Sequence, residues 1–172
     1  AGSYVTVRDL IDEVGRDATR FFLAARRADS QLTFDIDLAR SQSNDNPVYY
    51  IQYAHARVCS MLRKTQDADQ PFDHALALAN LALLDSDQEK AVLNRLARFP
   101  EVVETAARNR EPQQVAQYLL DLSGDFHTCY NAVKVMVEDD TLRNTRLALG
   151  LATRQVLRNG LDLMGVSAPE EM

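Results

Sequence analysis

The chain has 172 residues, 46% of them hydrophobic and 26% charged, which fits one compact domain or one domain with a short piece of another attached. Its formal net charge of -6 argues against a generic nucleic-acid binder, because contacts with phosphate groups need lysine and arginine. The longest apolar stretch, residues 75–84, is too short to span a bilayer, and Cys59 and Cys129 match no metal or redox spacing, so with no signal peptide we expect a cytoplasmic protein without membrane insertion.

The beginning of the chain predicts short helices and one extended piece. Thr6 followed by Asp9 forms a capping box for a helix that ends at Gly15. Residues 16–27 predict a second helix, with arginines at its end, where cations favour the helix dipole. Residues 32–37 alternate apolar and acidic side chains, which indicates an extended segment or a short edge strand.

From residue 46 onward every pattern predicts helix. Asn46 caps a long helix that should run to about Lys64, with a proline in its first turn. Further helices are expected from Ser86 to Phe99, from Pro100 to Asn109, from Pro112 to Met136 and over residues 141–165. The predicted fold is therefore an all-α helical bundle preceded by a short helical or extended segment.

Catalytic and metal-binding patterns are missing from the sequence. The three histidines, His55, His74 and His127, have no cysteine or carboxylate partners at metal-ligand spacing. The glycines form no phosphate-binding loop, and no hydrolase signature occurs. His127, beside Phe126, fits a buried and hydrogen-bonded core histidine better than a general base. We expect no catalytic residue and no metal site.

The helix that begins after Asn46 carries an unusual surface for an acidic protein. Residues 46–66 contain no aspartate or glutamate. Tyr49, Tyr53 and Arg57 lie at positions i, i+4 and i+8, on one stripe, where two rings and a guanidinium could stack unpaired bases. Gln52, close by, could add hydrogen bonds to a base. The alternative is a tyrosine stripe that packs against a neighbouring helix, with its hydroxyls at the rim.

The last predicted helix is basic in the same way. Its four arginines fall within an arc of roughly 120° when successive residues are turned by 100°. One positive face of this kind suits a phosphate backbone, although a solvated polar face would look similar. The candidate phosphate-contacting residues are Arg143, Arg146, Arg154 and Arg158.

Four segments in order carry a resemblance to a known family: "VTVRDLIDEVGRDATRFF", "RADSQLTFDIDLARSQSNDNPVYYIQYAHARVCSMLR", "FHTCYNAVKV" and "LATRQVLRNGLDLMGVSAPEEM". Together they resemble the C-terminal part of bacterial arginyl-tRNA synthetases, which are class I synthetases, and the resemblance covers essentially the whole chain. In that family the leading segment follows the KMSKS-type ATP signature loop. Neither that signature nor the HIGH signature is present here.

The resemblance implies that residues 1–45 are the C-terminal remnant of the catalytic region and that residues 46–172 are an all-α anticodon-binding domain. The parent enzyme would attach arginine to its tRNA with ATP and magnesium. This part would have no cofactor and no catalytic activity alone, and it would bind the anticodon loop of tRNA(Arg). The family suggests a monomer, and we expect no DNA partner.

The resemblance also places the anticodon contacts on the long helix and at the end of the chain. The predicted anticodon-binding residues, of which Gln52 comes from the helical reading above, are Asn46, Tyr49, Gln52, Tyr53, Arg57 and Met172 with its carboxylate. Position 171 is often basic in relatives but is Glu171 here, which weakens any role of that side chain at phosphate.

The genetic code indicates which base should be read. Arginine codons share a middle G, so the anticodons share a middle C, and discrimination there needs hydrogen bonds to the Watson–Crick edge. A helical protein–protein interaction bundle without an RNA partner is the alternative function, and it would also explain the acidic charge and the apolar helices. The anticodon domain of another class I synthetase is disfavoured by the continuity of the resemblance.

Overall fold

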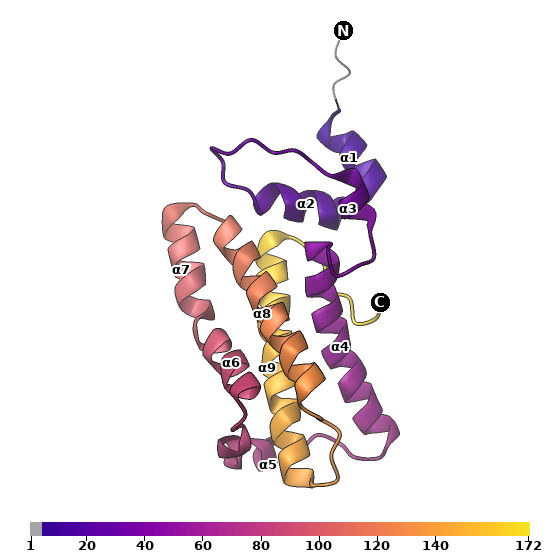
Figure 1. Ribbon diagram of the computed structural model, residues 1–172, viewed down its shortest axis with the longest axis vertical. Helices are drawn as coiled ribbons and strands as arrows, with labels where there is room; N and C mark the ends of the chain where they lie inside the picture. Colours follow the sequence, from indigo (N-terminus) through magenta and orange to yellow (C-terminus); the bar gives the residue numbers. More distant parts are fainter. Residues whose placement is uncertain (1–4) are drawn as a thin grey trace.

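The structure is a computed structural model that describes residues 5–172, and within them it contains helices and no strand (Figure 1). This confirms the all-α prediction. The elements are α1 (Val7–Val14), α2 (Arg16–Ala24), α3 (Ile36–Arg40), α4 (Pro47–Asp67), α5 (His74–Ala79), the 3-10 helix η1 (Leu81–Leu83), α6 (Asp87–Ala97), α7 (Phe99–Asn109), α8 (Gln113–Ala132) and α9 (Asp140–Met164).

The first three helices form a small layer at one end of a longer bundle (Figure 1). The capping box at the start of α1 is present, since Thr6 accepts from the amide of Asp9, whose side chain accepts from the backbone of Thr6. The alternative of an edge strand over residues 32–37 is wrong. Asp35 accepts a hydrogen bond from the amide of Leu38 and starts a helix there, so only the residues before it stay extended.

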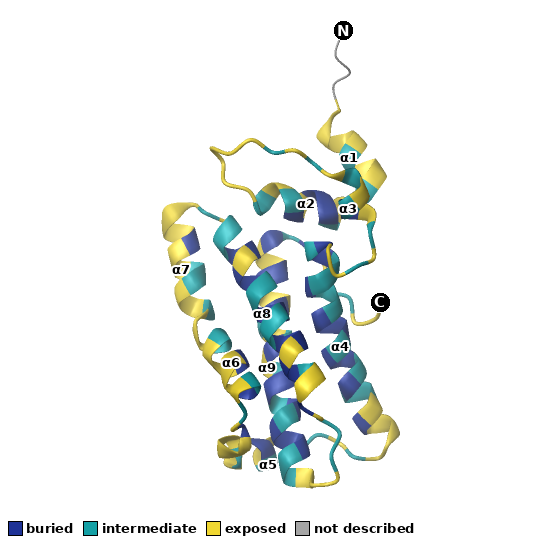
Figure 2. Ribbon diagram, in the orientation of Figure 1, coloured by how far each residue is buried: buried dark blue, intermediate teal, exposed yellow. Residues whose placement is uncertain are grey.

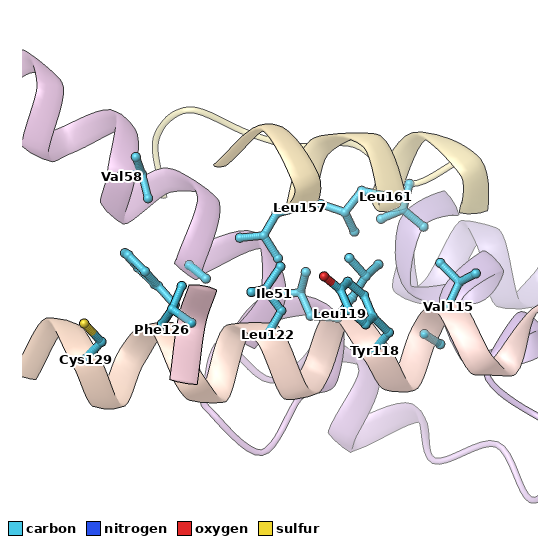
Figure 3. Close-up of a cluster of buried hydrophobic side chains, with 14 of the residues drawn as sticks. Ile51, Val58, Val115, Tyr118, Leu119, Leu122, Phe126, Cys129, Leu157 and Leu161 are labelled. Atoms are coloured by element: carbon cyan, nitrogen blue, oxygen red, sulfur yellow. The ribbon is translucent and has the colours of Figure 1, made fainter. Parts of the chain in front are cut away.

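Helices α4, α8 and α9 make the centre of the bundle, and α6 and α7 cover one side of it (Figure 1). Each of these five helices turns its buried residues toward the others (Figure 2). Ile51, Leu119, Leu122, Leu157 and Leu161 are fully buried and meet in the core (Figure 3). No helix within residues 5–172 has the length and apolar content needed to cross a membrane.

Helix lengths differ from the predicted ones where tertiary contacts decide. Helix α4 continues to Asp67, beyond the predicted Lys64. Helix α8 ends at Ala132 instead of Met136, because Val133 has an extended backbone and is buried in the core. The loop that follows α8 then covers the beginning of α9, where Arg143 and Arg146 lie.

The N-terminal layer is tied to the end of α9. The Nε of Arg20, on α2, donates to the carbonyl oxygen of Met164 at 3.0 Å. Gly165 follows in the left-handed region, with φ of 67°, and ends the helix. A Cβ at Gly165 would lie 2.6 Å from the Arg20 guanidinium, so both the conformation and the space require glycine.

Candidate nucleic-acid interface

The predicted stripe on α4 is formed. The rings of Tyr49 and Tyr53 stack, with centroids 6.0 Å apart and planes inclined by 12°, and both residues are half-buried. The guanidinium carbon of Arg57 lies 4.6 Å from the centroid of the Tyr53 ring, and its Nη2 donates to the Tyr53 hydroxyl at 3.0 Å. Two rings and one cation therefore make a continuous platform with an accessible edge.

Helix α8 completes this platform with two residues that the sequence reasoning did not assign to it. The centroid of the Tyr130 ring also lies close to the Arg57 guanidinium, 4.4 Å from its central carbon. His127 accepts from Nη1 of Arg57 at 3.1 Å through its Nδ1 and stacks on the Tyr53 ring. The available signal was the spacing i, i+3 of His127 and Tyr130, which puts them on one face of a helix.

The hydrogen bonds of His127 define its tautomer. Arg57 has no acceptor, so Nδ1 of His127 must carry the lone pair and Nε2 the hydrogen. That hydrogen is donated to the carbonyl oxygen of Tyr50 at 3.3 Å. Burial lowers the pKa of His127, and the charge of Arg57 lowers it further, against the opposing effect of the Tyr50 carbonyl. His127 is thus a buried, hydrogen-bonded histidine, as predicted, and it is neutral at pH 7.

Two hollows flank the platform, and Met172 lines both of them. The first, the Tyr49 hollow, has a volume of about 320 Å³ and is lined by residues that include Asn46, Tyr49 and Gln52. The second, the Tyr53 hollow, has a volume of about 420 Å³ and is lined by residues that include Tyr53 and Arg57. Met172 is 54% exposed. The structure therefore brings the end of the described chain beside the tyrosine stripe.

The Tyr53 hollow is the more polar and more basic of the two. Arg57, Arg63 and Lys64 line it, together with Tyr130, and the one acidic side chain in its lining is Glu171. The segment over residues 166–172, which follows α9 and is called the tail below, holds Arg63. Nη1 of Arg63 lies 3.5 Å from the Glu171 carboxylate and donates to the Glu170 carbonyl at 3.3 Å.

The segment that follows α9 runs along α4 and accepts hydrogen bonds from two of its side chains, one of which, Gln52, is a candidate for base recognition. The amide nitrogen of Gln52 donates to the Ser167 carbonyl at 2.9 Å and to Asp17 at 3.1 Å. Nδ1 of His55 lies 2.8 Å from the Pro169 carbonyl, so Nδ1 carries the hydrogen in this ring. Gln52 therefore holds the tail, and contact of its amide nitrogen with RNA would require these bonds to break.

Asn46 lines the Tyr49 hollow, but its amide is used by the protein. It is 5% exposed, and its side-chain oxygen caps α4 by accepting from the amides of Val48 and Tyr49. Its amide nitrogen donates to the carbonyl oxygens of Ala39 and Ser41, at 3.2 and 2.8 Å. Asn46 thus fixes the start of α4 and the loop before it.

The single positive face predicted for α9 is wrong, because its first half is covered. Arg143 is 3% exposed, pairs with Asp140 and donates to backbone oxygens of the loop over residues 134–138. Arg146 pairs at 2.8 Å with Glu89, a buried residue of α6. Burial raises the pKa of Glu89, but hydrogen bonds from its capping serine and from Arg146 outweigh it and leave that pKa below its ordinary value.

Arg154 and Arg158 lie elsewhere, beside the tail. Arg154 is half-buried and Arg158 exposed. Burial is the largest effect on the pKa of His55 and lowers it; the charges of Arg154 and Arg158 lower it further, and that of Glu170 raises it. Only these two of the four arginines remain available to a partner near the tail.

The arrangement can bind flat, uncharged groups and anions. Among residues 5–172 no group of three or more histidine, cysteine, aspartate or glutamate side chains could hold a metal ion. Both cysteines are buried and unpaired. An aromatic ring that stacks on one base contributes about 1–3 kcal/mol, and the two stacked tyrosines offer such a surface without any acid on α4 over residues 46–66.

Comparisons with known proteins identify the family of the chain. The sequence model of the family described as "DALR anticodon binding domain" matches residues 51–172. Arginine–tRNA ligase of Thioalkalivibrio sulfidiphilus is 55% identical over 172 residues, which is all of this chain and 29% of that protein. Arginine–tRNA ligase of Coxiella burnetii is 53% identical over 171 residues, again 29% of its length.

The fold is also similar to part of a solved arginyl-tRNA synthetase structure. The arginyl-tRNA synthetase of Thermus thermophilus superposes with a TM-score of 0.78 at 34% identity, over 93% of this chain and 27% of that one. The chain thus spans less than a third of the length of the curated relatives it matches.

Proposed function

This chain belongs to the family of DALR anticodon binding domains, and from that membership we propose that it binds the anticodon loop of tRNA(Arg) as part of an arginine–tRNA ligase. The observation that carries the proposal is the half-buried stack of Tyr49 and Tyr53, flanked by two hollows that share Met172. Volumes of about 320 and 420 Å³ lie within the range of roughly 300–1,000 Å³ common for small-molecule sites, which suits one splayed nucleotide in each.

The whole enzyme would carry the chemistry. It joins arginine to its tRNA with ATP and magnesium in the cytoplasm, as a monomer that needs no DNA. Residues 1–45 are the tail of its catalytic region and residues 46–172 its anticodon-binding domain. The chain itself supplies no catalytic group, so ATP is bound by the rest of the enzyme.

Recognition divides between the platform and the tail. Tyr49 and Tyr53 stack bases of any identity, and Arg57, Arg63 and Lys64 attract the backbone at the Tyr53 hollow. Discrimination of the middle C requires donors and acceptors at fixed positions. The backbone of the tail supplies them, held in place on α4 by Gln52, His55 and other side chains. Its neighbours Arg154 and Arg158 add positive charge on that side.

The test is a titration of this chain with the anticodon stem-loop of an arginine tRNA and with the same stem-loop altered at the middle base. We expect salt-sensitive binding of the first and weaker binding of the second, by about 1–3 kcal/mol, because a changed edge leaves a donor or acceptor unpaired. Binding to neither would favour a helical protein-interaction bundle. Equal binding to both would leave a stacking surface without base recognition.

A further inference from the structure

We infer that His127 is a positioning residue for Arg57 and that protonation of His127 weakens binding of the anticodon loop. The inference rests on the function proposed above. His127 belongs to α8 and lines neither hollow, but it contacts two platform residues of α4, Tyr53 and Arg57.

The geometry leaves Arg57 with few alternatives. Its guanidinium contacts two phenol rings, with its carbon 4.6 Å from the Tyr53 centroid and 4.4 Å from the Tyr130 centroid. One of its nitrogens donates to the Tyr53 hydroxyl and another to Nδ1 of His127. His127 therefore fixes the rotation of the guanidinium, and the guanidinium fixes the Tyr53 hydroxyl at the edge of the hollow.

His127 is itself held in one orientation. Its Nε2 hydrogen points at the Tyr50 carbonyl, 3.3 Å away on α4, and its ring packs against those of Tyr50 and Tyr53 at centroid distances of 4.6 and 5.6 Å. Each ring nitrogen therefore makes one hydrogen bond to α4, Nδ1 as an acceptor and Nε2 as a donor. Only the neutral form of the ring can make both bonds.

The charged and titratable groups around His127 come from two helices. On α4 they are Arg57, Tyr50 and Tyr53, which contact the ring directly. On α8, Tyr130 contacts the Arg57 guanidinium, and the charge of Asp125 acts on Tyr50. Asp125 is engaged by Arg95 at 2.8 Å. The nearest full charge that is free to act on a protonated His127 is therefore the cation of Arg57.

Protonation would replace an acceptor by a donor at Nδ1. Arg57 and His127 would then face each other as two donors and two cations, 3.1 Å apart in the neutral arrangement. Arg57 must move, and Tyr53 loses its partner. Loss of this arrangement should weaken binding to RNA. Added positive charge by itself would strengthen it, so the sign of the change in affinity separates the two effects.

The first experiment is nitrogen NMR of the histidine rings in the free chain. We expect His127 to be the Nε2–H tautomer at neutral pH, with a lone pair on Nδ1, and to have a pKa below the ordinary value for histidine. A His127 that is the Nδ1–H tautomer, or whose pKa is at or above that ordinary value, would overturn the inference. This readout needs no RNA, so it is independent of the proposed function.

The second experiment measures affinity for the arginine anticodon stem-loop as the pH is lowered through the His127 transition seen by NMR. We expect the wild-type chain to lose about tenfold in affinity across that transition, as the loss of a charge-assisted hydrogen bond implies. His74→Gln, at the far end of the bundle, should behave as wild type. Unchanged or tighter binding across the transition would overturn the inference.

Variants at constant neutral pH give the same answer without titration. His127→Gln retains an acceptor for Arg57 and a donor for Tyr50, so it should bind nearly as wild type and lose the pH dependence. His127→Ala should lose about tenfold, with folding checked by circular dichroism. Equal affinities of the Gln and Ala variants would contradict the positioning role. If the wild-type chain binds no stem-loop at neutral pH, the proposed function fails, whatever the NMR shows.

Discussion

The same substitution at two helical glycines should have opposite effects on stability. A Cβ at Gly160, on α9, would lie 2.5 Å from Cδ2 of Leu119, a fully buried residue of α8. A Cβ at Gly124, within α8, would have the Tyr50 hydroxyl as its nearest neighbour, at 3.8 Å, which is ordinary contact. The two positions therefore differ in space and share their secondary structure.

The magnitudes follow from two opposing terms. Alanine gains about 1 kcal/mol over glycine inside a helix. At Gly160 the added methyl must displace Leu119 in a close-packed core, which costs about 1–3 kcal/mol, and closer to the upper value here because two further atoms of Leu119 lie at 3.1 and 3.2 Å. Gly160→Ala should thus destabilise the chain by about 1–2 kcal/mol, and Gly124→Ala should stabilise it by up to about 1 kcal/mol.

Urea unfolding followed by circular dichroism measures both variants. The slope with urea should stay constant, so that the midpoint reports the free energy of unfolding. A Gly160→Ala variant at least as stable as wild type would refute the close approach of α8 and α9 described here. Destabilisation by Gly124→Ala would refute the open space beside Tyr50.

Three more predictions concern buried polar groups. Glu89→Ala should lower the free energy of unfolding by about 3 kcal/mol, because it leaves Arg146 without its carboxylate partner. Since the pKa of Glu89 is lowered, its contribution to stability is present above its ordinary pKa of 4.5 and is lost as the pH falls through the lowered pKa. Urea unfolding of the wild type and of Glu89→Gln at several pH values checks this dependence. Arg143→Ala should cost about 2 kcal/mol in the same assay and Arg158→Ala almost nothing, and equal costs would contradict the burial of Arg143. Burial raises the pKa of Cys129 to about 11, so this thiol should react with a thiol reagent only on unfolding, and rapid native labelling would count against that burial.

Local sequence patterns were sufficient for most of the helices and for the platform. The capping box at Thr6 and the cap at Asn46 are formed as predicted, and a helix starts after Ser86 as predicted, because a cap depends on residues within one turn. The stack of Tyr49 on Tyr53 likewise follows from the rise and twist of a single helix.

The errors arose where one helix meets another. A helical wheel of α9 cannot tell that the loop over residues 133–139 and α6 cover Arg143 and Arg146. The hydrogen bond from Gln52 to Ser167 could not be expected from the sequence, because the two residues lie far apart in it. The contact of His127 with Arg57 exists because α8 packs on α4. Each of these depends on tertiary pairing, which periodicity within one segment does not contain.

The most direct test of the account compares two effects of Tyr53→Ala: its effect on affinity for the arginine anticodon stem-loop and its effect on the free energy of unfolding. Removal of the ring takes away a stacking surface worth about 1–3 kcal/mol, so affinity should fall by about five- to 150-fold. The free energy of unfolding should change by less, because Tyr53 is only half-buried and lines the Tyr53 hollow. A variant that loses stability and keeps its affinity for RNA would show that the ring belongs to the core, and would contradict the interface proposed here.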